Sequence, residues 1–175
     1  FDIMKKKKIC VVTNPASNLK LASGIAPVKT YLEKGIPVAI GTDGPASNNC
    51  LDMFKEMFLV TGLQKVVHND PEAVPAADVL KMATVNGAYA MGLDNCDILA
   101  EGKYADLIMI DLMQPNMQPI QNIEKNVVYS ASKLNVKMTM IKVLYQDGIF
   151  YIGETKEKIY ENANRIAERI LDGKE

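Results

Sequence analysis

An aspartate that follows a short apolar run could bind a metal ion or move a proton. Asp43 lies in the sequence GTDGPASNN at residues 41–49. The apolar residues 37–40 before it predict a buried strand, and the apolar periodicity of residues 51–67 predicts a helix after it. In barrels built from strand and helix units, catalytic groups lie at this end of the strand. The alternative is that Asp43 and Gly44 form only a turn, in which the aspartate side chain bonds its own backbone.

A second apolar run, at residues 9–12, predicts another buried strand earlier in the chain. Residues 13–18 are rich in turn formers and predict a loop that continues to residue 24. Pro27 then suits the first turn of a helix, because its missing N–H would have no partner there. Residues 9–43 therefore predict one strand–helix–strand unit whose two strands are parallel.

The residues after this unit predict a series of helices. Asn49 is a suitable N-cap for the helix over residues 51–67. Pro75 is expected to open a helix over residues 76–83, and Thr84 is expected to cap a shorter one.

The pattern changes after residue 93, where strand-like segments predict a small β-domain. Residues 106–111 predict a strand, residues 137–143 alternate with a period of two, and residues 145–150 predict a hairpin with an Asp-Gly turn. A last amphipathic helix is expected over residues 156–171. We therefore divide the chain into three parts, residues 1–92, 93–155 and 156–175.

The composition is that of a globular protein. The chain has 175 residues, of which 48% are hydrophobic and 23% charged, and its net charge of -1 gives no reason to expect nucleic acid or a membrane as partner. No apolar run approaches the length of a membrane-spanning helix. Cys10, Cys50 and Cys96 fit neither a zinc spacing nor a disulfide framework, which favours a reducing compartment, the cytoplasm. The single histidine, His68, runs into a turn, so we expect it to have a surface role.

Two parallel strands cannot close a barrel or cover both faces of a sheet. We therefore expect a missing partner, which is either an earlier part of the same polypeptide or another chain. Val11, Val12, Val38 and Ile40 are expected to lie on strands with open edges and uncovered faces. Because such surfaces recruit partners, we expect a homo-oligomer or retention of the N-terminal part.

Four segments of the chain stand out by their order and spacing: NPASNLKLASGIAPV at residues 14–28, GTDGPASNN at 41–49, MATVNGA at 82–88 and EGKYADL at 101–107. Together they resemble the amidohydrolase superfamily. Within the superfamily the resemblance is to 5-methylthioadenosine/S-adenosylhomocysteine deaminases, a group often labelled chlorohydrolases or cytosine-deaminase-like proteins. It implies that the chain is the C-terminal part of an enzyme more than twice as long.

The resemblance implies an α/β fold, namely the C-terminal portion of a (β/α)8 TIM barrel together with part of a small β-sandwich domain. Strands at residues 8–13 and 37–43 would be the seventh and eighth strands of the barrel. Residues 93–155 would supply later strands of the sandwich. The helix within residues 156–175 would pack back on the barrel.

By the same resemblance, Asp43 would be both a metal ligand and a catalytic residue. It would bind one divalent metal ion, zinc, and take a proton from the attacking water while ammonia is released from an adenosine-type nucleoside. The family's metal-binding histidines and acid/base glutamate would lie upstream, so we expect the isolated chain to hold no catalytic metal and to be inactive. Thr13 stands where many relatives have a histidine, a change that concerns substrate contacts.

Two alternatives remain open. The chain could come from another amidohydrolase, such as a guanine deaminase or a triazine chlorohydrolase. It could also be a non-catalytic binding or assembly module, because it has one histidine and an incomplete barrel. An upstream His-x-His sequence in the parent gene would favour the enzyme.

Overall fold

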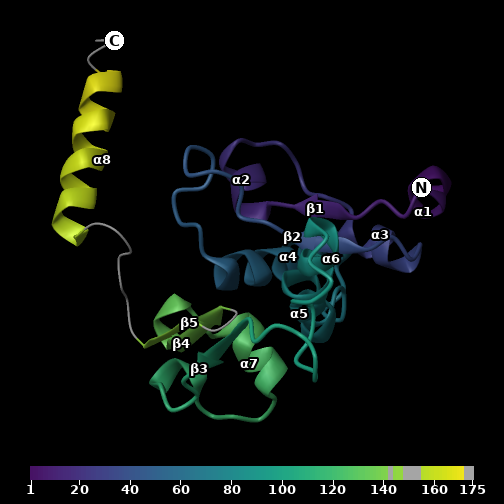
Figure 1. The fold of residues 1–175 in the computed structure, drawn as a ribbon. Coiled ribbons are helices and arrows are strands. Elements are labelled where there is room, and N and C mark those ends of the chain that lie inside the picture. The colour runs from purple at the N-terminus through teal and green to yellow at the C-terminus, as the bar shows by residue number, and fades with distance from the viewer. Residues whose placement is uncertain (142–143, 148–154, 172–175) are drawn as a thin grey trace. The chain divides into compact units, whose positions relative to one another are not determined.

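The computed structural model describes residues 1–141, 144–147 and 155–171, which form the helices and strands of an α/β protein (Figure 1). The chain divides into two compact units, residues 1–145 and residues 146–175. The α/β class agrees with the expectation from the sequence. The expected domain boundaries at residues 92 and 155 stay predictions.

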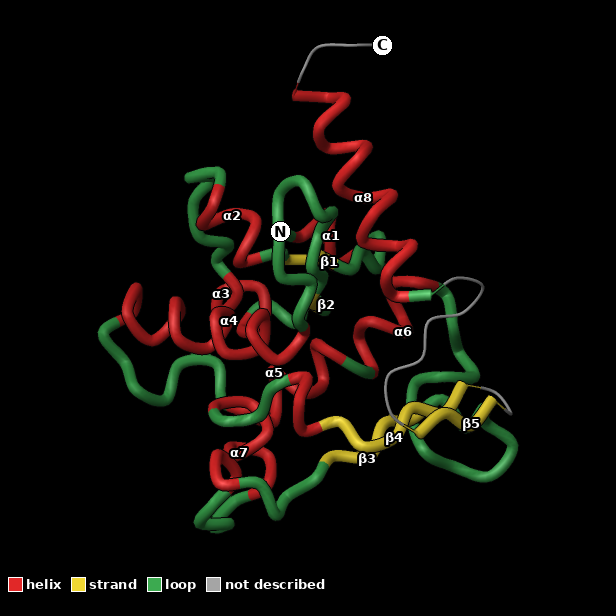
Figure 2. The backbone as a smooth tube through the Cα atoms, turned by 90° about the vertical axis from the view of Figure 1, so that its left-hand side faces the viewer, coloured by secondary structure: helices red, strands yellow, loops and turns green. Residues whose placement is uncertain are grey.

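The first sheet contains the two parallel strands that the sequence predicts. Strand β1 (Val11–Thr13) pairs with strand β2 (Val38–Ile40), and Val12 lies opposite Ala39. The strands lie side by side in both ribbon and tube views (Figure 1 and Figure 2). Helix α3 (Val28–Glu33) connects them. Because the strands are parallel, the segments that follow them start from the same edge of the sheet.

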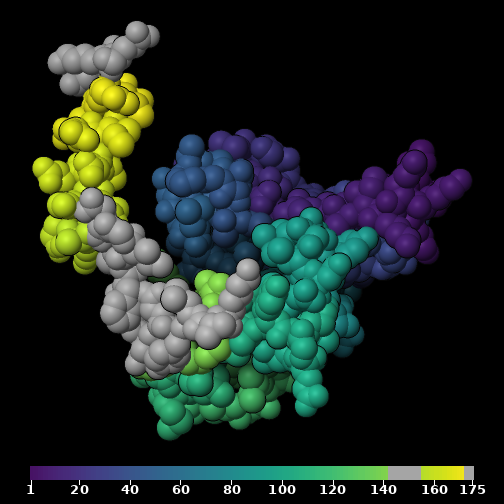
Figure 3. All heavy atoms as spheres, in the orientation of Figure 1, coloured from purple at the N-terminus to yellow at the C-terminus, as the bar shows by residue number. Residues whose placement is uncertain are grey.

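The segment after β1 is a helix, whereas the sequence predicts a loop there. Helix α2 (Pro15–Lys20) begins with a proline, a residue that the first helical position tolerates well. The amide of Ala16 donates a hydrogen bond to the Glu56 carboxylate at 2.9 Å, so a residue distant in sequence satisfies one of the unpaired amides at the helix start. The space-filling view shows this segment, in purple, against the residues that follow β2, in blue (Figure 3).

Helix α4 (Met53–His68) begins later than predicted, because Asp52 rather than Asn49 is its N-cap. The Asp52 carboxylate accepts a hydrogen bond from an amide of the first turn at 3.0 Å. The Asn49 side chain instead accepts a hydrogen bond from the ammonium of Lys20 at 2.7 Å. His68, in the last turn of the helix, is exposed as expected.

Helices bury β2 within the chain. Helices α3 and α4 contact β2, as do the predicted helices α5 (Ala76–Ala83) and α6 (Val85–Met91). Val38 and Ile40 are only 0% and 6% exposed, so the expectation that these side chains are uncovered is wrong. Val12 on β1 is 50% exposed. The open apolar surface of this sheet therefore lies on β1 alone.

A second sheet has the strand order β3-β4-β5 (Figure 2). Strand β3 (Leu107–Ile110) pairs antiparallel with β4 (Val136–Ile141), and β5 is Leu144–Asp147. Strands β3 and β4 confirm the strands predicted in this region. The ends of the predicted alternation and of the predicted hairpin lie outside the described residues, at residues 142–143 and 148–150.

Helix α7 (Ile123–Tyr129) lies in a region where the sequence predicts only strands and loops. The Asn122 side chain caps its start. The helix contacts α4 and α5, and its residues Val127 and Val128 belong to the same buried cluster as the core of those helices. Two short 3-10 helices flank it, Pro115–Met117 and Lys133–Asn135.

Helices also lie near both ends of the chain. Helix α1 is Asp2–Lys6, and helix α8 is Lys156–Leu171, the range predicted for the last helix. The hydroxyl of Thr155 accepts a hydrogen bond from the amide of Lys158 at 3.4 Å, the contact that an N-cap side chain makes. Among the described residues, no helix combines the length and apolar character that crossing a bilayer requires.

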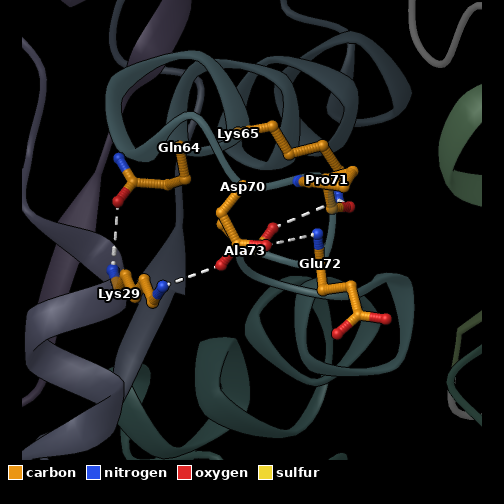
Figure 4. A network of polar contacts seen from close by, with 7 residues as sticks. All are labelled: Lys29, Gln64, Lys65, Asp70, Pro71, Glu72 and Ala73. Carbon is orange, nitrogen blue, oxygen red and sulfur yellow. Dashed lines mark hydrogen bonds and ion pairs between the residues drawn. The ribbon is translucent and has the colours of Figure 1, made fainter.

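A polar network holds the turn after α4 against the start of α3 (Figure 4). The backbone amide of Lys29 donates to Gln64 at 3.1 Å, and its ammonium donates to Asp70 at 2.9 Å. This contact is the main cause that lowers the pKa of Asp70 and raises the pKa of Lys29. Lys65 donates to two carbonyl oxygens of the same turn. The network therefore fixes the C-terminal half of α4.

Candidate active site

Asp43 lies on the surface just beyond the carboxyl end of β2. Its side chain is exposed, and its backbone is in the left-handed region with a φ of 60°. Aspartate tolerates this region better than most residues, because its side chain bonds locally. Here Oδ1 accepts a hydrogen bond from the Gly44 amide at 2.8 Å. The turn that the sequence offers as an alternative is therefore present, but it uses only one of the two carboxylate oxygens.

Two serine hydroxyls bind the other oxygen of Asp43. Ser17 on α2 and Ser47 in the loop after β2 each donate to Oδ2 at 2.7 Å. The carboxylate is thus held by the segments that follow both parallel strands. Both serines lie within the segments quoted from the sequence, but the sequence predicts no role for either. The one feature of the sequence that could indicate such a role is that each serine stands in the polar segment after a predicted strand.

These hydrogen bonds lower the pKa of Asp43 below the ordinary aspartate value. The largest contribution comes from Ser17, followed by Ser47 and the Gly44 amide. Asp43 is therefore a carboxylate at neutral pH. A carboxylate offers about four acceptor positions, and the three donors leave one of them open on Oδ1. The open position suits a cation or a water molecule.

The sequence SNN at residues 47–49 holds the loop after β2 in place. Ser47 binds the carboxylate described above, and the Asn48 amide donates to the carbonyl oxygen of Thr42 at 2.8 Å. The Asn49 oxygen accepts from the Lys20 ammonium, which also donates to a carbonyl oxygen of the same loop at 2.8 Å. Each of the three residues of this motif therefore has its own contact.

Gly41 lets the ends of the two strands approach each other. A Cβ atom at this position would clash with Oδ1 of Asn14 and would lie 3.2 Å from Cγ1 of Val12. The Gly41 amide donates to the carbonyl oxygen of Thr13 at 2.9 Å, and Thr13 itself is buried on β1. A larger residue at position 41 would therefore push the segment that carries Ser17 away from Asp43.

The described residues supply one carboxylate rather than a complete metal site. Within the ranges that the structure describes, no three His, Cys, Asp or Glu side chains come together as a metal-binding group. Zinc sites use three or more protein ligands. Asp43 fits such a site as one ligand, and the other ligands would come from outside the described residues.

Comparison with protein families matches residues 2–174 to the amidohydrolase family. The chain belongs to this family. A 5-methylthioadenosine/S-adenosylhomocysteine deaminase of Dictyoglomus thermophilum is 45% identical over 172 residues, which are 97% of this chain and 40% of that relative. A 5'-deoxyadenosine deaminase of Methanosarcina acetivorans is 44% identical over 173 residues, which are 98% of this chain and 40% of that relative.

A solved structure of the same family has a closely similar fold. An adenosine deaminase from Xanthomonas campestris, determined with bound zinc, matches with a TM-score of 0.88 and 35% identity, and the match covers 98% of this chain and 39% of that chain. The resemblance predicted from the sequence is thereby confirmed. The present 175-residue chain spans about two fifths of the length of the relatives it matches.

We expect Gly41→Ala to lower the free energy of unfolding by about 1–3 kcal/mol, the usual cost of overpacking a tight site. Gly62→Ala is the matched control, because a Cβ atom on Gly62 meets no atom within 4 Å. Gly62 lies inside α4, so this change should stabilise the chain by up to about 1 kcal/mol. Urea unfolding measures both changes.

Truncation of the clashing side chain provides the second control. Gly41→Ala combined with Asn14→Ala should be less destabilised than the sum of the two single variants, because the clash needs both side chains. A Gly41→Ala chain as stable as the Gly62→Ala chain would show that the two strand ends do not approach as described.

Proposed function

We propose that the complete protein is a metal-dependent hydrolytic deaminase of adenosine-type nucleosides, to which this chain contributes Asp43. One observation carries the proposal: the Asp43 carboxylate is exposed at the carboxyl end of β2, is kept ionised by its donors and has one open acceptor position. Family membership supports it. The names of the relatives at 44% and 45% identity support the nucleoside substrate.

In this proposal, Asp43 has two tasks. The open position on Oδ1 would serve as one ligand of a divalent metal ion; zinc is the ion in the Xanthomonas structure. A bound zinc ion supplies Lewis acidity, which lowers the pKa of water toward neutrality. The carboxylate would also accept a proton from the water that adds to the purine ring, and would return it to the departing amine.

The second task needs a second free position on the carboxylate. Ser47 can provide it by rotating its hydroxyl, because its Oγ also lies 3.1 Å from the carbonyl oxygen of Gly44, an alternative acceptor. Ser17 would keep its bond to Oδ2 and hold the carboxylate in place. The loop serine would thus adjust the basicity of Asp43, since loss of one donor raises the pKa of a carboxylate.

The rest of the architecture follows from the same proposal. Strands β1 and β2 would be the seventh and eighth strands of a (β/α)8 barrel, and its other strands would lie in the remainder of the protein. Val12, half exposed on β1, supports a further element against that strand. Residues 93–155 would form part of a β-sandwich, and residues 156–175 a helix that packs on the barrel. A second copy of the protein is a further expected partner, and the cytoplasm is the expected location.

Substrate preference tests the proposal against a guanine deaminase or a triazine hydrolase. The complete enzyme should release ammonia from 5-methylthioadenosine, S-adenosylhomocysteine or 5'-deoxyadenosine, as the names of the relatives suggest. The value of kcat/KM for each is compared with the values for guanine and for a chlorotriazine, where chloride release is followed instead. Preference for guanine or the triazine would contradict the proposed substrate class.

Replacement of the carboxylate tests its role. In the complete enzyme, Asp43→Asn should lower kcat/KM by about two to four orders of magnitude, the usual effect of losing a proton-transfer group. Asp70→Asn is the control, because Asp70 binds Lys29 instead of the serines and should leave activity unchanged. Near-full activity of Asp43→Asn would remove Asp43 from the mechanism. The isolated chain should show no deaminase activity in either form.

A further inference from the structure

Glu56 is a buried carboxylate that the proposed mechanism does not use. It lies in the first turn of α4 and is 0% exposed. Its Oε2 accepts a hydrogen bond from the Ala16 amide at 2.9 Å, and its Oε1 accepts one from the Asn48 side-chain amide at 2.7 Å. In the part of the chain that the structure describes, the ion pairs do not include it. Burial of a carboxylate is costly unless hydrogen-bond donors satisfy both of its oxygens. The two hydrogen bonds to Glu56 meet this requirement.

The two donors adjoin the two serines that bind Asp43. Ala16 immediately precedes Ser17, and Asn48 immediately follows Ser47. The buried carboxylate of α4 therefore joins the same two segments that the exposed carboxylate joins at the surface. One of these segments follows β1 and the other follows β2.

The pattern of donors requires a carboxylate between them. The side-chain nitrogen of Asn48 is fixed as the donor, because it also donates to Thr42 at 2.8 Å while the Asn48 oxygen accepts from the Cys50 amide at 3.1 Å. The Ala16 amide is a donor as well, so Glu56 must offer two acceptors. Glutamine has the same length, but its NH2 group would face one of the two donors.

We propose that Glu56 is a positioning residue for Asp43, a role that rests on the function proposed above. Glu56 fixes the backbone next to Ser17 and next to Ser47, and thereby sets where the two hydroxyls meet Oδ2 of Asp43. The orientation of the open position on Oδ1 follows from these contacts. Loss of Glu56 should therefore weaken the binding of a metal ion at Asp43 and not only the stability of the fold.

The test compares Glu56→Gln with Gln64→Met in the complete enzyme. Gln64 is a matched control: it is buried on the same helix and bonds the Lys29 amide and the Ala26 carbonyl oxygen, outside the Asp43 site. Both variants should lower Tm. Only Glu56→Gln should weaken the zinc affinity of the metal-free enzyme, by about ten- to a hundredfold, as is typical when a group that orients a metal ligand is lost. Competition with a chromophoric chelator measures this affinity.

Kinetics and a conservative variant complete the test. Glu56→Gln should lower kcat at saturating zinc and leave KM within about twofold, because Glu56 does not bind substrate. Glu56→Asp keeps two acceptor oxygens on a shorter side chain and should retain more of the zinc affinity than Glu56→Gln does. This variant also serves as the test if Glu56→Gln does not fold, in which case zinc binding as weak as that of Asp43→Asn contradicts the role.

The outcomes separate this role from the proposed function. If Glu56→Gln binds zinc as tightly as Gln64→Met, Glu56 has only a structural role and the inference is wrong. If Asp43→Asn itself binds zinc as tightly as the unchanged enzyme, Asp43 is not a metal ligand and the proposed function fails instead.

Discussion

The hydrogen bonds from Ser17 and Ser47 to a single oxygen of Asp43 are the contacts on which the site depends. They come from two segments that are distant in sequence and meet only because β1 and β2 are parallel neighbours. The two bonds hold the carboxylate in one orientation and keep it ionised. They also leave an acceptor position on Oδ1, so the same contacts that lower its basicity prepare Asp43 to bind a cation.

Several residues that are far apart in the sequence help to bring these two segments together. Gly41 allows the strand ends to approach, and the Lys20 ammonium on α2 donates hydrogen bonds to the loop after β2. Glu56 joins the segments from the buried side. The surface site therefore depends on a buried side chain of the core helix α4.

The sequence predicts the parts of this arrangement that local patterns determine. Apolar runs locate β1 and β2, proline and periodicity locate α5 and α8, and the position after a strand singles out Asp43. The sequence does not predict α2, which is stabilised at its start by Glu56, or α7, whose buried residues pack against α4 and α5. It predicts a buried strand at β2 but not that helices of the same chain cover it, and it misses the roles of both serines. Each of these features depends on residues that are far apart in the chain, which no local pattern reports.

The most direct test of these contacts at Asp43 is a titration of its carboxyl carbon by NMR in the metal-free 175-residue chain. We expect the pKa of Asp43 to lie below the ordinary aspartate value of about 3.9. The pKa should rise in Ser17→Ala and in Ser47→Ala, with the larger rise in Ser17→Ala, because Ser17 makes the largest contribution. An ordinary pKa that neither substitution changes would show that the two segments do not meet at Asp43.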